Sequence, residues 1–211
     1  MRILAGILVV FSLLAAPADG RAEEGEWGVF IIGGAVFPNF SPEDPVAFDL
    51  AAGFLGFGGT YGLLDDLWLD ARVSFTDYGG QTRERVQFRS QTLEGNLFFS
   101  STQAHPTVGV QYNIFPGYDF SPYLVARGGF VFSTFRNVLF LNDNNEAFAG
   151  VDFDDSSEIQ WTVTGGLSFE YRFYEFLLIG VEPTFTKTLN SGRNDWFFNA
   201  TLKFTVLLGD G

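Results

Sequence analysis

The chain has 211 residues, among them 26 phenylalanines and 25 glycines but no cysteine, and its formal net charge is −13. Without cysteine no disulfide can hold a small loop-rich scaffold, and an acidic chain lacks the basic patch that nucleic-acid binding requires. The length suits a single domain, and the many aromatic residues favour β-strands.

The first 22 residues have the pattern of a secretory signal peptide. Arg2 precedes an apolar run at 3–14, and the small residues Ala18 and Ala22 offer two cleavage sites. This run is too short for a helix that spans a bilayer, and no run of 18 apolar residues follows residue 20. We therefore expect a signal peptide at 1–22 and one mature domain at 23–211.

The segment 159–173 has the clearest alternation in the chain. Its odd-numbered residues are mostly large and apolar, such as Trp161, whereas its even-numbered residues include Glu170 and Arg172. Successive side chains of a strand point to opposite faces, so this pattern predicts a strand with one apolar and one polar side. Comparable patterns predict further strands at 47–62, 67–76, 107–115, 122–135, 177–185 and 196–208. A first strand is predicted at 26–37, but its two faces cannot be told apart because both are apolar or glycine.

The segment 77–106 is the hardest part of the chain to interpret. Residues 77–85 are polar and contain two glycines, and residues 86–100 alternate only weakly. We interpret 86–100 as a β excursion within a long outer loop that also holds His105. The alternative is that 86–100 forms a full strand of the wall.

Short and long connections alternate along the chain. The short ones lie at 63–66, 116–121 and 174–175, and the long polar ones lie at 38–46, 77–106, 136–158 and 190–195. Short turns at one end and long loops at the other are typical of transmembrane β-barrels, whose strands are about ten residues long. The predicted fold is all-β: an eight-stranded antiparallel up-and-down transmembrane barrel with both termini in the periplasm.

Three strand–turn–strand units carry a resemblance to a known family. The segments 61–75, 108–129 and 167–185 resemble units of the small outer-membrane β-barrel proteins of Gram-negative bacteria, the OmpA-like and OmpX-like class. The resemblance implies an outer-membrane location and insertion by the outer-membrane assembly machinery. One departure from the family is the last strand, which ends at Leu208 rather than at an aromatic residue.

If the apolar faces meet lipid, a balanced set of charges points into the barrel. This alternation places Ala52 and Phe54 on the outer face of their strand, opposite Asp49. The inward set has four acids and four bases: Asp49, Asp70, Glu170, Glu182, Arg72, Arg127, Arg172 and Lys203. Unpaired buried charge is costly, and eight strands leave a lumen that side chains can fill. We expect a paired network that plugs the lumen; the alternative is a narrow, gated ion path.

Neither catalysis nor metal binding is predicted. His105 is the only histidine and has no nucleophile or acid at a characteristic spacing. The acids Asp152, Asp154 and Asp155 could share a calcium ion, but the run lacks the twelve-residue loop pattern and suits a solvated loop better. We therefore predict no catalytic residue, no metal site and no cofactor.

Two further positions give structural expectations. Trp68 falls on the inward face of its strand, so we expect it to be part of the core rather than of an interfacial aromatic belt. Pro183 lies inside a strand and cannot donate to a ladder, so we expect a bulge or a weak pair there.

The functional expectation is an integral outer-membrane protein without enzymatic activity. It would act structurally or through its acidic outer loops, as a monomer in contact with outer-membrane lipid and lipopolysaccharide. One alternative is a narrow pore or transporter of small solutes. Another is a lipid-modifying barrel enzyme, and the last is a secreted, lipocalin-like barrel, whose apolar faces would point inward around a ligand.

Overall fold

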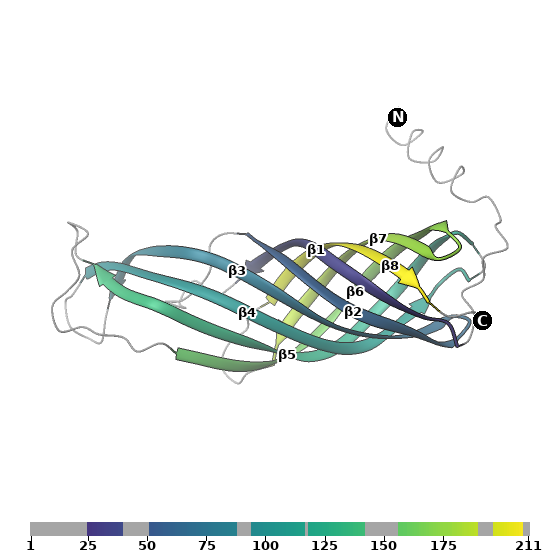
Figure 1. Cartoon of the computed structure of the whole chain (residues 1–211). Helices are drawn as coiled ribbons and strands as arrows, with labels where there is room; N and C mark the ends of the chain where they lie inside the picture. Colours follow the sequence, from purple (N-terminus) through teal and green to yellow (C-terminus); the bar gives the residue numbers. More distant parts are fainter. Residues whose placement is uncertain are drawn as a thin grey trace, which may run out of the picture.

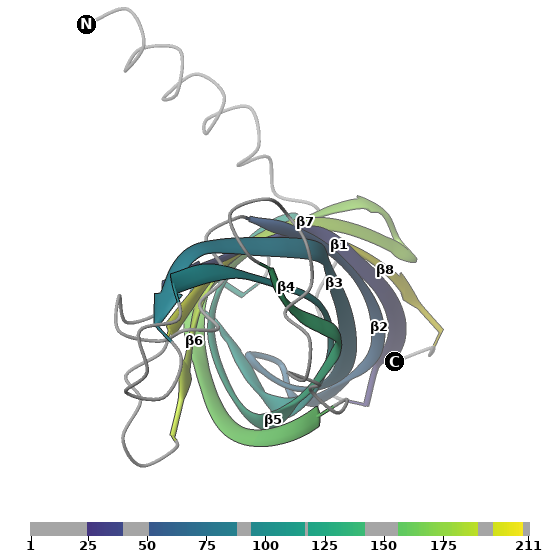
Figure 2. The same cartoon turned by 90° about the vertical axis from the view of Figure 1, so that its left-hand side faces the viewer.

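A computed structural model describes residues 25–39, 51–87, 94–116, 118–141, 156–189 and 196–208. The described residues form eight strands that close into an antiparallel barrel, because β1 pairs with β8 as well as with β2. Figures 1 and 2 show the barrel from the side and along its axis. The strands are β1 (Trp27–Asn39), β2 (Ala52–Leu64), β3 (Leu67–Gln87), β4 (Glu94–Asn113), β5 (Phe120–Leu141), β6 (Ser156–Tyr174), β7 (Leu177–Thr188) and β8 (Trp196–Leu207).

The predicted order of eight neighbouring antiparallel strands is confirmed. No helix long and apolar enough to cross a membrane occurs in the described ranges. The predicted signal peptide at 1–22 lies outside them.

The two ends of the barrel differ, as the connection lengths predict. The short connections 65–66, 114–119 and 175–176 lie at one end, which we call the turn end. The first and last strands meet there, since the backbone N–H of Leu208 donates to the carbonyl of Trp27 at 2.8 Å. The opposite end, where the strands that flank the longer connections end, is called the loop end.

Within the segment 77–106 the described residues, 77–87 and 94–106, are strand rather than loop, so this prediction was wrong. β3 continues to Gln87 and pairs with β4 as far as Glu94, and β4 pairs with β5 as far as Leu141. Two irregularities in the β3–β4 register, at 77–79 and 83–86, interrupt the alternation that would identify a strand, and Gly79 has a φ of 61°. The weakly alternating residues 94–100 are thus the first part of wall strand β4.

β3, β4 and β5 extend past the other strands at the loop end, as Figure 1 shows. The last pair of β3 with β2 is Thr76 with Phe54, and the last pair of β5 with β6 is Phe135 with Ser156. Beyond these pairs only the three strands themselves continue the ladder. We call this three-stranded extension, residues 77–87, 94–101 and 136–141, the projecting sheet.

The alternation of side chains is confirmed in most strands but was wrong in β2. In β3 and in β5 to β8 the predicted outward faces are outside, and the predicted inward faces, which hold the charged residues, are inside. In β2, however, Ala52 and Phe54 are buried, whereas Leu55 and Phe57 are exposed on the outer wall. β2 is rich in glycine and both of its faces are apolar, so its sequence provides no contrast between inside and outside.

The register of β7 does not shift at Pro183, so the strand has no bulge there, but its pairing with β6 is weak at this position, which was the other expectation. Pro183 pairs with Ala200 of β8, but the ladder between β7 and β6 has no pair between Gly166–Thr184 and Phe169–Val181. The missing donor of proline therefore leaves a gap in one ladder only.

Gly58 illustrates how tightly the inner wall is packed. A Cβ at Gly58 would overlap the carbonyl oxygen of Ala71 and the ring of Phe30, whereas a Cβ at Gly128 would meet nothing within 4 Å. We expect Gly58→Ala to lower the free energy of unfolding by about 1–3 kcal/mol, as overpacking does. Gly128→Ala should instead leave stability unchanged or raise it by up to about 1 kcal/mol. Urea titrations of both variants folded in lipid vesicles would test this, and equal effects would contradict it.

Candidate functional site

Four charged side chains meet across the lumen and form what we call the ionic ring. Asp70 and Arg72 come from β3, Arg127 from β5 and Glu182 from β7, and each occupies an inward position of its strand. Their side chains are at most 7% exposed. Since two acids meet two bases, the ring carries no net charge.

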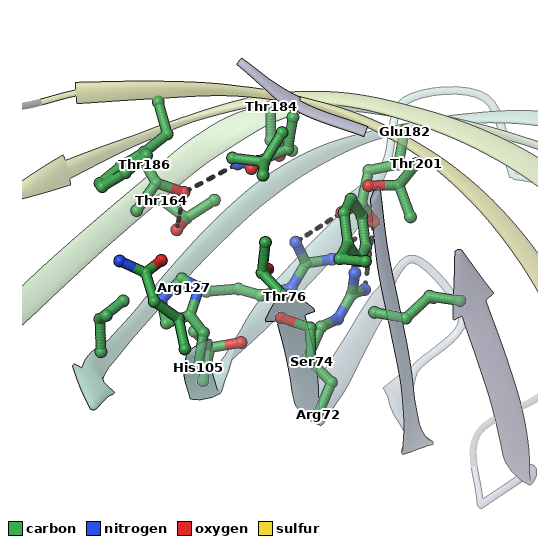
Figure 3. A pocket seen from close by; sticks show the side chains of 18 residues that line it. Arg72, Ser74, Thr76, His105, Arg127, Thr164, Glu182, Thr184, Thr186 and Thr201 are labelled. Atoms are coloured by element: carbon green, nitrogen blue, oxygen red, sulfur yellow. Dashed lines mark hydrogen bonds and ion pairs between the residues drawn. The ribbon is translucent and has the colours of Figure 1, made fainter. Parts of the chain in front are cut away.

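Each guanidinium of the ring binds both carboxylates. Arg72 donates to Asp70 at 2.9 and 2.8 Å and to Glu182 at 2.9 and 3.1 Å. Arg127 donates through Nε to Asp70 at 2.6 Å and through both Nη atoms to Glu182 at 2.8 Å. Forked, charge-assisted contacts of this kind are among the strongest hydrogen bonds in proteins. Figure 3 shows Arg72, Arg127 and Glu182 converging on one point of the lumen.

A lysine cluster adjoins the ring on its turn-end side. Lys203 of β8 donates to Glu170 of β6 at 2.8 Å and to Gln111 of β4 at 3.4 Å. Gln111 in turn donates to Asp70 at 2.8 Å, which joins the cluster to the ring. The ring of Phe30 lies beneath both cations, 4.7 Å from the Lys203 ammonium and 5.1 Å from the Arg72 guanidinium. This contact adds a cation–π attraction from β1.

A layer of buried apolar side chains crosses the barrel nearer the turn end. It brings together residues of β3, β5, β7 and β8, and we call it the apolar layer. Its members are Trp68, Tyr123, Leu178 and Leu207. The expectation that Trp68 belongs to the core is confirmed.

Two cavities lie on opposite sides of the ionic ring. The larger, about 60 Å³, is on the loop-end side, and Arg72, Arg127 and Glu182 form part of its wall. The smaller, about 10 Å³, is bounded by the lysine cluster and the apolar layer. The wall of the larger cavity is rich in hydroxyl groups, contributed by Ser74, Thr76, Thr107, Thr164, Thr184, Thr186 and Thr201.

The outer wall is apolar and has aromatic residues near both ends. Among its exposed side chains, Trp27 and Tyr61 lie near the turn end, and Trp161 and Trp196 lie towards the loop end. Leu55, 74% exposed, lies between the two levels. An apolar band flanked by aromatic side chains is the surface that a β-barrel presents to a lipid bilayer.

Several solved outer-membrane proteins have the same architecture. No protein-family model matches the chain, and no curated protein matches it in sequence. The attachment invasion locus protein Ail of Yersinia pestis superposes with a TM-score of 0.55 at 14% identity, over 88% of this chain and 99% of Ail. A major outer membrane protein of Thermus thermophilus gives 0.55 at 9% identity, over 86% of this chain and 99% of that one. The outer membrane protein OprG of Pseudomonas aeruginosa superposes with a TM-score of 0.50 at 18% identity, over 89% of this chain and 99% of OprG.

The chain has the fold of the small outer-membrane β-barrels. The resemblance to the OmpA-like and OmpX-like class is therefore confirmed at the level of fold.

Six of the eight predicted lumen charges meet inside this barrel. Asp70, Arg72, Arg127 and Glu182 form the ionic ring, and Glu170 and Lys203 belong to the adjoining cluster. Arg172 is separate: it lies at the turn end, 3.5 Å from Glu26, and also donates to the carbonyl of Glu175. Asp49 lies outside the described residues.

Three residues of the lumen, Glu26, Phe30 and Gln111, are not identified by the alternation of apolar and polar residues. Glu26 begins the predicted strand 26–37, whose two faces cannot be told apart, and Gln111 is uncharged, so a search for inward charges finds neither. Phe30 was missed because both faces of its strand are apolar or glycine. Its inward position would have followed only from its pairing with the glycine-rich β2.

His105 lies on β4 rather than in a loop, and this prediction was wrong. It is opposite Ser74 of β3, faces the larger cavity, and its Nε2 is 2.9 Å from the Thr162 hydroxyl. In the described part of the barrel no carboxylate hydrogen-bonds to the ring of His105. The His105–Thr162 pair therefore lacks the third group, an acid, that orients the histidine in a catalytic triad. No group of three metal-ligating side chains occurs in the same part, and Asp152, Asp154 and Asp155 lie outside it.

Proposed function

We propose that the protein is an integral outer-membrane protein without enzymatic activity, that its lumen is closed, and that it acts at the cell surface. The observation that carries the proposal is the ionic ring, in which every carboxylate and guanidinium is paired across the lumen. Passage of an ion would require these contacts to separate. Breaking a buried charge pair costs several kcal/mol, so the paired state favours a closed barrel.

The projecting sheet is the part of the wall best suited to contact other molecules. Beyond Thr76, β3 pairs only with β4 among the described residues, so its other edge has no strand partner among them. An edge of this kind can accept an extended segment of another chain. We therefore place the surface role on the projecting sheet together with the acidic connections beside it.

The charge of two connections at the loop end indicates which kind of partner they can bind. The connections 40–50 and 142–155 hold three and five acidic residues and no basic one. Ail has also been solved with the heparin analogue sucrose octasulfate, a polyanion. Eight acids without a base disfavour such a ligand here, so a partner of these connections would be basic or would pair through its backbone.

The remaining contacts follow from the wall. The apolar band suits outer-membrane lipid and lipopolysaccharide, with the turn end and both termini in the periplasm. Insertion would depend on the outer-membrane assembly machinery. Because the barrel closes on itself, no partner subunit is needed to complete the sheet, and we propose a monomer.

The closed lumen predicts electrical silence. We expect the purified, folded protein to give no discrete conductance in planar bilayers over the usual range of applied voltages. A shift in gel mobility between boiled and unboiled samples would verify that the inserted protein is folded. Discrete conductance from protein that passes this control would favour the pore alternative, which the polar cavity of about 60 Å³ supports.

The surface role is tested by trimming the barrel. Asp77 is opposite Thr102, and Phe135 is opposite Ser156. An Asn-Gly turn in place of 78–101 and another in place of 136–155 should therefore keep the wall register. Since Ail is named for attachment, we choose attachment of expressing cells to protein-coated plates as the readout. The trimmed barrel should stay heat-modifiable and lose attachment; unchanged attachment would contradict the proposal.

The lipocalin-like alternative is disfavoured by the placement of side chains. Phe57, Trp161 and Phe185 are each more than half exposed on the outer wall, whereas the charged residues point inward. A water-soluble barrel that holds an apolar ligand needs the opposite arrangement.

A further inference from the structure

The apolar layer crosses the lumen at a different level from the ionic ring. Along β3, Trp68 is one inward position closer to the turn end than Asp70. Along β5 and β7, Tyr123 and Leu178 each lie two inward positions beyond their ring residues. The four side chains of the layer are between 3% and 8% exposed. The layer therefore blocks the lumen by packing, without help from the charges of the ring.

The small cavity between the two levels contains unpaired polar atoms. Trp68 Nε1 and Thr205 Oγ1 are buried and have no hydrogen-bond partner among the described residues, and both residues line this cavity. Glu170 and Lys203 also line this cavity. The volume of about 10 Å³ matches the room that one water molecule needs, and the wall offers the several polar partners that a buried water requires.

We propose that the lumen has two closures in series, the ionic ring and the apolar layer, and that the chamber between them holds one water molecule. The water accepts a hydrogen bond from Trp68 Nε1–H and bonds to the Thr205 hydroxyl. This inference rests on the proposed closed lumen. It adds that opening the ring alone does not create a conducting path, because a dry apolar constriction resists the passage of ions.

Paired variants in planar bilayers test the two closures. The ring variant is Arg72→Ala with Glu182→Ala, which preserves net charge and leaves Arg127 bound to Asp70. The layer variant is Trp68→Ala with Tyr123→Ala. Each variant is first checked for the boiling-dependent gel shift. We expect silence from the wild type, from the ring variant and from the layer variant, and discrete conductance only from the combination of all four substitutions.

Each other result has a defined meaning. Conductance from the ring variant alone would overturn the apolar layer as a closure, and conductance from the layer variant alone would overturn the ionic ring as one; in both cases the closed wild-type lumen would stand. If the variant with all four substitutions is folded but gives no conductance, the ionic ring and the apolar layer are not the barriers to ions. Conductance from the wild type would instead overturn the proposed function, so the two failures are distinguishable.

The chamber water has its own readout in the indole signal of Trp68. The chain has four tryptophans, so ¹⁵N labelling gives four indole N–H resonances, and Trp68→Phe identifies one of them. We expect this N–H to exchange slowly with D₂O and to show cross-relaxation with a long-lived water molecule. Leu178→Ser should speed the exchange at least tenfold. A protected signal without cross-relaxation to water would overturn the occupied chamber, and rapid exchange in the wild type would overturn its closure.

Discussion

Replacing Arg127 by methionine is expected to lower the free energy of unfolding of the barrel by about 3–5 kcal/mol. Arg127 makes three hydrogen bonds in the ionic ring, and its side chain is 2% exposed. Its removal leaves Asp70 and Glu182 to share Arg72, so the lumen keeps an uncompensated buried charge. Urea titration in lipid vesicles, followed by the fraction that keeps the unboiled gel mobility, would measure the loss.

The matched control is Arg136→Met on the same strand. Arg136 is exposed and lies in the projecting sheet, so the same substitution should change stability by no more than about 0.5 kcal/mol. Equal losses from the two variants would show that the methionine side chain, not the broken ring, causes the effect. A loss below about 1 kcal/mol at Arg127 would mean that the ring contributes little to stability.

An arginine at Leu55 should destabilise the membrane-inserted barrel by about 2–4 kcal/mol. Leu55 points outward and is opposite Gly33, which is midway along β1 (Trp27–Asn39). If the apolar band spans the bilayer, this position lies near the midplane, where a charge on the lipid face is most costly. Unfolding of Leu55→Arg and wild type in vesicles of the same lipid gives the difference.

Leu139→Arg is the control for membrane depth. Leu139 is also exposed, at 44%, but it belongs to the projecting sheet, beyond the level at which the other strands end. The same substitution should cost less than about 1 kcal/mol there, because charges near or beyond the interface are tolerated. If both substitutions lower the free energy of unfolding by a similar amount, the bilayer position assumed here is wrong. If neither lowers it, the wall does not span a membrane.

The strands that the sequence predicts best are those with chemically different faces. In β6 and β7 the alternation gives both the strand and its inward side correctly, because Glu170, Glu182 and the threonines contrast with the outward apolar residues. β2 has glycine or apolar residues on both faces, so Phe54 was assigned to the wrong side. The projecting sheet was missed for another reason: outside a bilayer neither face needs to be apolar, so polar residues such as those at 81–85 fit a strand.

The site was predictable as a set of charges but not as a set of contacts. The alternation along each strand places Asp70, Arg127 and Glu182 on inward faces, one strand at a time. Which of them meet depends on how far neighbouring strands are staggered around the barrel, and a single sequence does not encode this in any local pattern. Arg72 and Glu182, for example, are 110 positions apart. Arg172, assigned to the same network, pairs instead with Glu26 at the turn end because its strand is staggered relative to β3.

The origin of the ionic ring in β3, β5 and β7 has a consequence for assembly. No hairpin contains the whole ring, so its contacts cannot form until the sheet has curled far enough to bring these strands face to face. Until then one face of the growing sheet carries apolar side chains and the other carries charged side chains that have not yet found their partners. The charged face must therefore stay in water. Curling and bilayer entry must therefore proceed together, and such dependence on long-range contacts makes folding slow and nearly all-or-none.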